Sequence, residues 1–171
     1  MQTLTAVRRP LWLALLLFIT TLARAEDPVG IRFFTGTWKE LLAEAKKQNR
    51  PIFVDVYTTW CGPCKMMAKQ AFPDKAVGEL FNAHFVNYQL DAEKGEGIAL
   101  AKQYNVTAYP TAIYVSARGD LIHRTIGYGG IKGLMDEANK AIEAAKALSL
   151  LRSGIKSLLT ATATLSFYER T

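Results

Sequence analysis

The two cysteines of this 171-residue chain, Cys61 and Cys64, stand two residues apart, between an apolar run and a helical pattern. Side chains at positions i and i+3 of a helix share one face, roughly 5–6 Å apart at Cβ, and a disulfide closes from there with little backbone movement. Unpaired amides and the dipole at a helix start lower the pKa of a cysteine and raise its thiolate fraction. The spacing therefore predicts thiol-disulfide exchange, with Cys61 as the exposed attacking thiol and Cys64 as the resolving thiol.

The residues around the cysteines fit the same chemistry. Gly62 lets another chain approach the backbone closely, and Pro63 lacks an N–H that the first helical turn would leave unpaired. Asp55 is the single carboxylate in the apolar strand pattern six residues before Cys61. Burial would raise its pKa and suit it to exchange a proton with Cys64, whereas the alternative is a hydrogen-bonded structural aspartate.

A permanent stabilising disulfide and a zinc site are the alternatives for the cysteine pair. A bond that closes so short a loop restricts the unfolded chain little, so its stabilising value is small. A structural zinc ion needs four ligands, and the chain offers one Cys-x-x-Cys, with His84 and His123 far apart in sequence. We therefore expect a redox pair, with no metal and no organic cofactor.

The stretch from Trp60 to Lys65 resembles the active-site motif of the thioredoxin family, in which Asp55 matches a buried aspartate. The resemblance extends from about Trp38 to Leu148. The chain resembles periplasmic thioredoxin-like domains more closely than it resembles cytosolic thioredoxin. The C-terminal domain of membrane-bound thiol:disulfide interchange proteins is an example of such a domain. Cytosolic thioredoxins carry a lysine near the buried aspartate, at a position that aligns with Asn87 here.

The resemblance also implies a surface that binds substrates. Tyr109-Pro110-Thr111 stands where the family has its cis-proline, and Gly127 stands where it has a glycine flanking the active site. Because cis X–Pro bonds are a minority, only the resemblance makes Pro110 cis and places Tyr109 beside the cysteines. The substrate-binding residues that the family implies are Trp60, Gly62, Pro63, Tyr109, Pro110 and Gly127.

Helical and strand patterns alternate around these residues. Thr37 and Glu40 fit a capping box for a helix that ends at Pro51, and the strand 52–57 follows, apolar on both faces as in the centre of a sheet. The other expected elements are helices at about 61–71, from 73, at 98–104 and at 131–148, and strands at 85–90, 111–115 and 121–126. They predict an α/β fold, a three-layer α/β/α sandwich of thioredoxin type with a central mixed sheet.

The N-terminal segment, residues 1–25, has the features of a secretory signal peptide. Arg8 and Arg9 form a basic start, an apolar run covers 11–22, and Ala23-Arg24-Ala25 is a small-x-small cleavage site. The alternative is an N-terminal membrane anchor, but the apolar run falls short of the roughly 20 residues that span a bilayer.

Residues 26–152 form the expected thioredoxin-like domain, and residues 153–171 form a C-terminal tail of unknown role. Gly154 is typical of a helix stop, and beyond it either a docked extra helix or a frayed end fits the pattern. Removing the signal peptide takes away three arginines and no acidic residue, so the formal net charge falls from +6 to +3. Charges of both signs are interspersed along the chain, which indicates a solvated surface and no nucleic-acid partner.

We therefore expect a monomeric protein, periplasmic or secreted, that reduces protein disulfides. The Gly62-Pro63 dipeptide is that of reducing thioredoxins, and no histidine stands between the cysteines as in the strongly oxidising relative. Its expected partners are protein thiols and disulfides, cytochrome-maturation thiols among them, and a membrane thiol that donates electrons. The alternatives are a disulfide oxidase or isomerase, and a polypeptide-binding module of thioredoxin fold with incidental redox activity.

The mature protein should begin at Glu26, because the apolar run is short and the preceding Ala23-Arg24-Ala25 suits a signal peptidase. N-terminal mass analysis of the exported protein checks this. Intact protein retained in the membrane fraction would show that the segment is an anchor instead.

Overall fold

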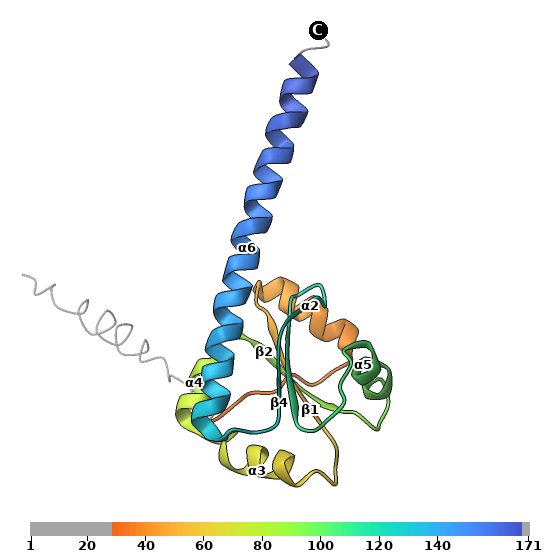
Figure 1. Ribbon diagram of the computed structural model, residues 1–171, viewed down its shortest axis with the longest axis vertical. Coiled ribbons are helices and arrows are strands. Elements are labelled where there is room, and N and C mark those ends of the chain that lie inside the picture. The colour runs from red at the N-terminus through yellow and green to blue at the C-terminus, as the bar shows by residue number, and fades with distance from the viewer. Residues whose placement is uncertain (1–28, 169–171) are drawn as a thin grey trace, which may run out of the picture.

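The computed structural model describes residues 29–168, and a four-stranded sheet of order β2-β1-β3-β4 lies at their centre (Figure 1). β1 (Ile52–Tyr57) runs parallel to β2 (Val86–Asp91) and antiparallel to β3 (Thr111–Val115), and β3 pairs antiparallel with β4 (Leu121–Ile126). The sheet is mixed, as the sequence predicts, and β1 is one of its two central strands.

Helices cover both faces of the sheet. α2 (Trp38–Gln48) and α5 (Gly97–Gln103) lie on one face, and α3 (Gly62–Gln70), α4 (Lys75–His84) and α6 (Gly130–Tyr168) lie on the other (Figure 1). This arrangement is the expected three-layer α/β/α sandwich, so the predicted fold class is confirmed.

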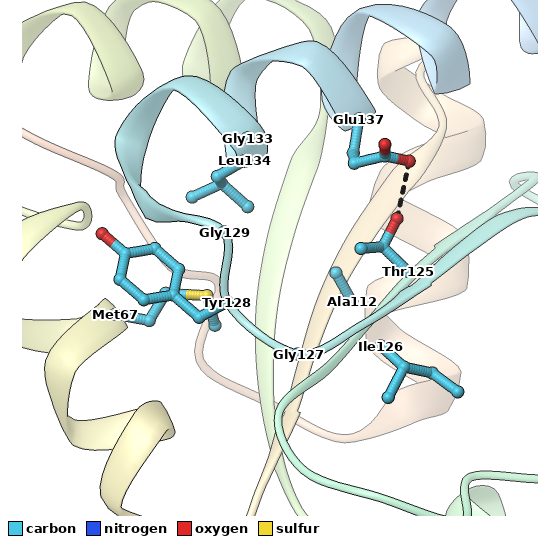
Figure 2. A pocket seen from close by; sticks show the side chains of 10 residues that line it. All are labelled: Met67, Ala112, Thr125, Ile126, Gly127, Tyr128, Gly129, Gly133, Leu134 and Glu137. Atoms are coloured by element: carbon cyan, nitrogen blue, oxygen red, sulfur yellow. Dashed lines mark hydrogen bonds between the residues drawn. The ribbon is translucent and has the colours of Figure 1, made fainter.

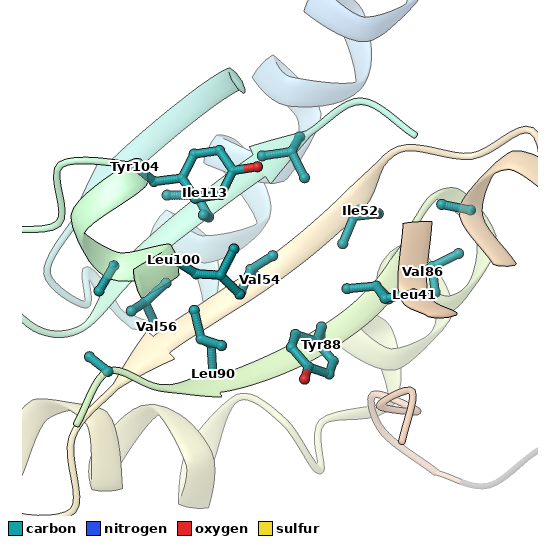
Figure 3. Packing of buried hydrophobic residues seen from close by; sticks show 14 residues of the cluster. Leu41, Ile52, Val54, Val56, Val86, Tyr88, Leu90, Leu100, Tyr104 and Ile113 are labelled. Atoms are coloured by element: carbon teal, nitrogen blue, oxygen red, sulfur yellow. The ribbon is translucent and has the colours of Figure 1, made fainter. Parts of the chain in front are cut away.

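Successive side chains of β1 enter two different cores, because strand residues point alternately to opposite faces. Ile52, Val54 and Val56 are fully buried in the core beneath α2 and α5 (Figure 3). Phe53 lies on the other face, where its ring packs edge-on against that of Phe81 with centroids 4.7 Å apart. Each such side chain contributes about 1.5–3 kcal/mol when fully buried, so β1 fixes both helical layers to the sheet.

The capping box predicted at the start of α2 is present. The side chain of Thr37 accepts a hydrogen bond from the backbone N–H of Glu40, and the Glu40 carboxylate accepts one from the backbone N–H of Thr37. Asn49 ends the helix in the left-handed conformation, at φ 52°, which asparagine tolerates better than most residues. The chain then turns directly into β1.

The prediction that Gly154 ends the last helix is wrong, because α6 continues through this residue to Tyr168. A glycine inside a helix costs only about 1 kcal/mol relative to alanine, which is too little to stop a helix by itself. Ser153 and Thr160 also donate hydrogen bonds to carbonyls of the preceding turn. The tail is therefore neither a separate docked helix nor a frayed end over its described residues.

The predicted signal peptide, residues 1–25, lies outside the described residues. Side chains are described for residues 29–160. Within residues 29–168, none of the helices has the length and apolar character needed to cross a membrane.

Candidate active site

The two cysteines are joined by a disulfide at the start of α3, with Cα atoms 5.3 Å apart. Cys61 is the N-cap residue of this helix, and its Sγ accepts a hydrogen bond from the backbone N–H of Cys64 at 3.1 Å. Pro63 lies in the first turn. The expected position of Cys61 at a helix start is confirmed, and the helix N-terminus with the Cys64 amide favours negative charge on its sulfur.

Both cysteines are buried in this disulfide form, with exposed fractions of 3% for Cys61 and 5% for Cys64. The expectation of an exposed Cys61 is therefore wrong for the oxidised protein. Its sulfur turns back onto the first turn of α3, where it bonds to Cys64 and accepts the Cys64 amide. Trp60, the residue before, is 64% exposed, and a Cβ added at Gly62 would meet no atom within 4 Å. Open surface therefore lies next to the disulfide.

Asp55 is buried in the middle of β1, with an exposed fraction of 2%. It lies between Gln89 of β2 and Ala112 of β3 in the register of the sheet. Desolvation raises the pKa of the Asp55 carboxyl from 3.8 to about 7, although a hydrogen bond from the Gln89 side chain to Oδ2 at 3.2 Å opposes the shift. Its Oδ1 has no hydrogen-bond partner among the described residues. The expected rise of the Asp55 pKa is confirmed.

Gln89, rather than Asn87, is the β2 side chain beside the buried carboxyl. Asn87 pairs with Phe53, and its amide nitrogen donates to the backbone oxygen of Arg32 and to the side chain of Asn82. Asn87 therefore holds the segment before α2 against the sheet. Sequence reasoning missed Gln89, although the two-residue period of β2 puts it on the same face as Asn87.

Trp60 is held by a loop that sequence reasoning did not assign to the site. Its indole N–H donates to both carboxylate oxygens of Glu93, at 3.0 and 3.1 Å. Its ring meets that of Tyr109 nearly at a right angle, with centroids 5.9 Å apart. Glu93 lies two residues after the end of β2, and Tyr109 lies two residues before β3. Tyr109 therefore contacts Trp60, the residue that precedes Cys61.

The peptide bond between Tyr109 and Pro110 is cis, which confirms the expectation drawn from the resemblance. The backbone N–H of Gly127 donates to the Pro110 carbonyl at 2.7 Å. Gly127 has φ 87°, in the left-handed region where a side chain is strained. Of the three predicted residues, Pro110 and Gly127 are thus joined by a backbone hydrogen bond, and Tyr109 contacts Trp60.

A cavity of about 180 Å³ lies behind Gly127, between α3, β4 and the start of α6 (Figure 2). Met67, Tyr128 and Leu134 form its apolar wall, and Glu137 lies at one end. Hydrogen bonds from Lys140, Thr125 and His123 lower the pKa of Glu137 to about 2. The hydrogen bond from Thr125 joins β4 to α6 (Figure 2).

The described part of the chain contains no group of three or more histidine, cysteine or acidic side chains that could hold a metal ion. His123, one of the two histidines considered above, lies 2.6 Å from the Glu137 carboxylate, between β4 and α6. His84 ends α4. Neither histidine is a neighbour of the disulfide in sequence.

Comparison with known proteins agrees with this geometry. The family model of a thioredoxin-like domain matches residues 38–141. The chain belongs to the thioredoxin-like family. It is 36% identical over 111 residues to Thioredoxin H2 of Arabidopsis thaliana, which covers 63% of this chain and 77% of that protein. A solved structure described as a candidate disulphide-isomerase, from Bacteroides thetaiotaomicron, shares 39% identity with a TM-score of 0.62, covering 68% of this chain and 97% of that one.

Thioredoxin-like relatives also include parts of larger proteins. The thiol:disulfide interchange protein DsbD of Yersinia pestis is 30% identical over 95 residues, which are 55% of this chain and only 15% of the relative. A closed Cys-x-x-Cys disulfide at a helix start in a thioredoxin-like domain has the chemistry of a thiol-disulfide oxidoreductase. The Cys61–Cys64 pair is the redox centre that this chemistry requires.

Replacing Asp55 with asparagine should stabilise the oxidised protein above pH 7, and the gain should vanish towards pH 4. In the native protein the Asp55 carboxyl has a pKa near 7 and keeps its proton up to about neutral pH. In the unfolded chain the same carboxyl has its ordinary pKa of 3.8 and loses the proton above that pH. The wild-type free energy of unfolding should therefore fall as pH rises through this window, by at most about 4 kcal/mol, and the variant should lack this slope.

Denaturant titrations across this pH range measure the slope. Asp136→Asn removes a carboxyl that is exposed on α6 and is the control, since its slope should match that of the wild type. Parallel slopes in wild type and Asp55→Asn would contradict the assignment.

Proposed function

We propose that this protein is an exported thiol-disulfide oxidoreductase that reduces disulfides in other proteins through its Cys61–Cys64 pair. The observation that carries the proposal is the disulfide itself, closed at the N-cap of α3 beside Trp60. A stabilising disulfide has no need of a helix N-terminus, whereas a reactive cysteine gains thiolate character there.

The reaction has two exchange steps. In the reduced enzyme, the Cys61 thiolate attacks one sulfur of a substrate disulfide, so the substrate S–S bond breaks and a Cys61–substrate mixed disulfide forms. The Cys64 thiolate then attacks the Cys61 sulfur, which releases the second substrate thiol and closes the Cys61–Cys64 disulfide. Two electrons pass from enzyme to substrate, and the oxidised state that remains is the one described above.

Asp55 is the proposed proton acceptor for Cys64 in the second step. A group whose pKa lies near 7 exchanges protons efficiently at neutral pH, and burial holds the Asp55 carboxyl at that value. The Oδ2 atom is occupied by Gln89, so the unpartnered Oδ1 is the atom that remains to take a proton.

The surface formed by Trp60, Tyr109, Pro110 and Gly127 is the proposed substrate-binding site. Extended polypeptide pairs with free backbone groups at a strand end, and the backbone of Tyr109, just before β3, is proposed to provide them. The Pro110 carbonyl is already occupied by the Gly127 N–H. The Glu93 carboxylate fixes the Trp60 ring over this surface. Both Glu93 and Tyr109 thus act as positioning residues for Trp60.

Reduction is the proposed direction because Gly62-Pro63 separates the cysteines and no histidine lies between them to stabilise a thiolate. A reductase outside the cytosol needs electrons from elsewhere, and a membrane thiol donor is proposed for this role. The match to a thiol:disulfide interchange protein supports it. Cytochrome-maturation thiols are among the proposed clients, and the periplasm is the proposed location if the N-terminal segment is a signal peptide.

Disulfide isomerisation is a second candidate, favoured by the similarity to the candidate disulphide-isomerase from Bacteroides thetaiotaomicron. An isomerase needs the same attack by Cys61 but releases the substrate through the substrate's own thiols. The two functions therefore differ in how far they depend on Cys64.

Replacing Cys64 with serine should trap substrates covalently on Cys61, because the attacking thiol remains and the resolving thiol is lost. Mixed disulfides resolved on non-reducing gels and identified by mass spectrometry provide the measurement. Cys61→Ser is the matched control and should trap few substrates or none. Equal trapping by both variants would mean that the roles are assigned wrongly.

Replacing Asp55 with asparagine should slow the resolution of the mixed disulfide by at least about tenfold at neutral pH, because a proton acceptor is lost while the side-chain shape is kept. In the wild type the rate should rise with pH and level off above the Asp55 pKa of about 7. Stopped-flow kinetics between about pH 6 and pH 9 follow this step. Identical profiles for the two proteins would leave Asp55 with a structural role alone.

The reduction potential should lie near the value of about −270 mV typical of thioredoxin, and far from the value of about −120 mV of the strongly oxidising periplasmic relative. Equilibration of the protein with glutathione at defined ratios gives the potential directly. A value near that of the oxidant would reassign the protein as an oxidase.

A further inference from the structure

The last part of α6 extends past the globular domain, and on the way Arg152 forms an ion pair with Asp120, in the turn between β3 and β4, at 3.6 Å. Leu134, Ala138 and Ala141 bury the first turns of this helix against the sheet layer, whereas every described residue from 146 to 160 is exposed. Figure 1 shows the helix leaving the domain at the end opposite α3. Residues 146–168 are called the arm, and 23 helical residues are about 35 Å long. The redox reaction proposed above does not use the arm.

The arm carries an apolar stripe. Leu148, Leu151 and Ile155 are 49%, 65% and 58% exposed, and Leu158 and Leu159 follow at 68% and 66%. Spacings of three and four residues place these five side chains along one side of the helix. A continuous exposed stripe of large apolar side chains marks a surface that binds something, because single exposed leucines are ordinary but an ordered row is not.

The charged residues of the arm are all basic. Lys146, Arg152 and Lys156 are the only charged residues of the arm sequence, which therefore carries three positive charges and no negative one. At 100° per residue, Lys146 lies opposite the apolar stripe, and Arg152 and Lys156 lie beside it. The ion pair of Arg152 with Asp120 is exposed to solvent on both sides, so it holds Arg152 only weakly. Seven of the other fifteen positions of the arm are serine or threonine. Cations that flank an apolar stripe are typical of helices that lie in the interface of a membrane with anionic lipids.

The same stripe would also fit a coiled coil between two copies of the chain, but the charges argue against this pairing. Coiled coils use opposite charges beside the seam, whereas the arm offers Arg152 there and no acidic residue to meet it. Two arms side by side would gather positive charge only.

We propose that the arm docks in the plane of an anionic lipid surface, with Leu148, Leu151 and Ile155 among the acyl chains and Arg152 and Lys156 at the headgroup phosphates. The helix lies on the membrane and does not cross it. Because the arm leaves the domain at the end opposite α3, the disulfide stays accessible while the protein is held at the membrane (Figure 1). This docking does not depend on the redox function.

Hydrogen-deuterium exchange of the full chain, read peptide by peptide, tests the proposal. The probe is vesicles of phosphatidylcholine with about 30% phosphatidylglycerol, compared with pure phosphatidylcholine and with no vesicles. Anionic vesicles should slow exchange in arm peptides by at least about tenfold and leave β1 and β3 peptides unchanged, because an unsupported helix opens readily and a docked one does not. The peptide-resolved readout separates arm binding from any binding by residues 1–25.

Leu151→Asp should abolish this protection, whereas the matched control Leu150→Asp should retain it. The two leucines are neighbours with the same exposed fraction of 65%, but Leu150 points away from the apolar stripe. Both variants change exposed side chains, so both should fold, and an unchanged thermal midpoint confirms this. High salt should weaken the protection in the wild type, since exposed charges are screened.

Four outcomes would overturn the proposal. Arm peptides unaffected by anionic vesicles would mean that the arm does not bind lipid. Protection without vesicles that rises with protein concentration would show pairing with a second copy. Protection without vesicles that stays the same at every protein concentration would show that the stripe packs against the protein's own chain. Equal loss in both variants would show that the stripe does not define the binding face.

Discussion

Burial of a carboxyl group in a central strand of the sheet is the constraint from which the rest of the site follows. β1 has a partner strand on each side and helices over both faces, so Asp55 is enclosed, and its pKa rises to about 7. The ionised form of a buried carboxylate is costly, and one hydrogen bond from Gln89 recovers only part of that cost. The protein therefore retains a proton-exchanging group at neutral pH at the expense of stability.

The same strand also positions the disulfide. β1 ends at Tyr57, and a short turn leads to Cys61 at the N-cap of α3, so Asp55 and the cysteines are fixed to one rigid element. A second element, the loop before β3, brings the cis bond at Pro110 to the same end of the sheet, where Tyr109 contacts Trp60. α6 holds β4 through the hydrogen bonds of Glu137, and its far end carries the exposed stripe away from this site. Redox chemistry and the proposed membrane contact thus occupy opposite ends of the domain.

Local sequence signals predicted the features that depend on local chemistry. The spacing of Cys61 and Cys64, the lone carboxylate in an apolar strand and the capping box at Thr37 each act over a few residues, and the structure confirms them. The cis bond at Pro110 followed from family resemblance alone. Gln89 and Glu93 were missed because their partners are more than 30 residues away and come together only through the pairing of β1 with β2. The exposure of Cys61 was misjudged because it depends on which way the closed disulfide turns, and Gly154 was taken as a stop although one glycine costs a long helix little.

The central claim, that the Cys61–Cys64 pair exchanges disulfides with other proteins, is tested most directly by the turnover of insulin reduction. The reduced protein, supplied with a small dithiol as electron source, should cleave insulin disulfides over many cycles and precipitate the released chain. Cys61→Ser should abolish turnover while the fold remains intact, because it removes the attacking sulfur of the pair. A wild-type rate no higher than that of the dithiol alone, or a Cys61→Ser variant as active as the wild type, would contradict the account and leave a polypeptide-binding module of thioredoxin-like fold.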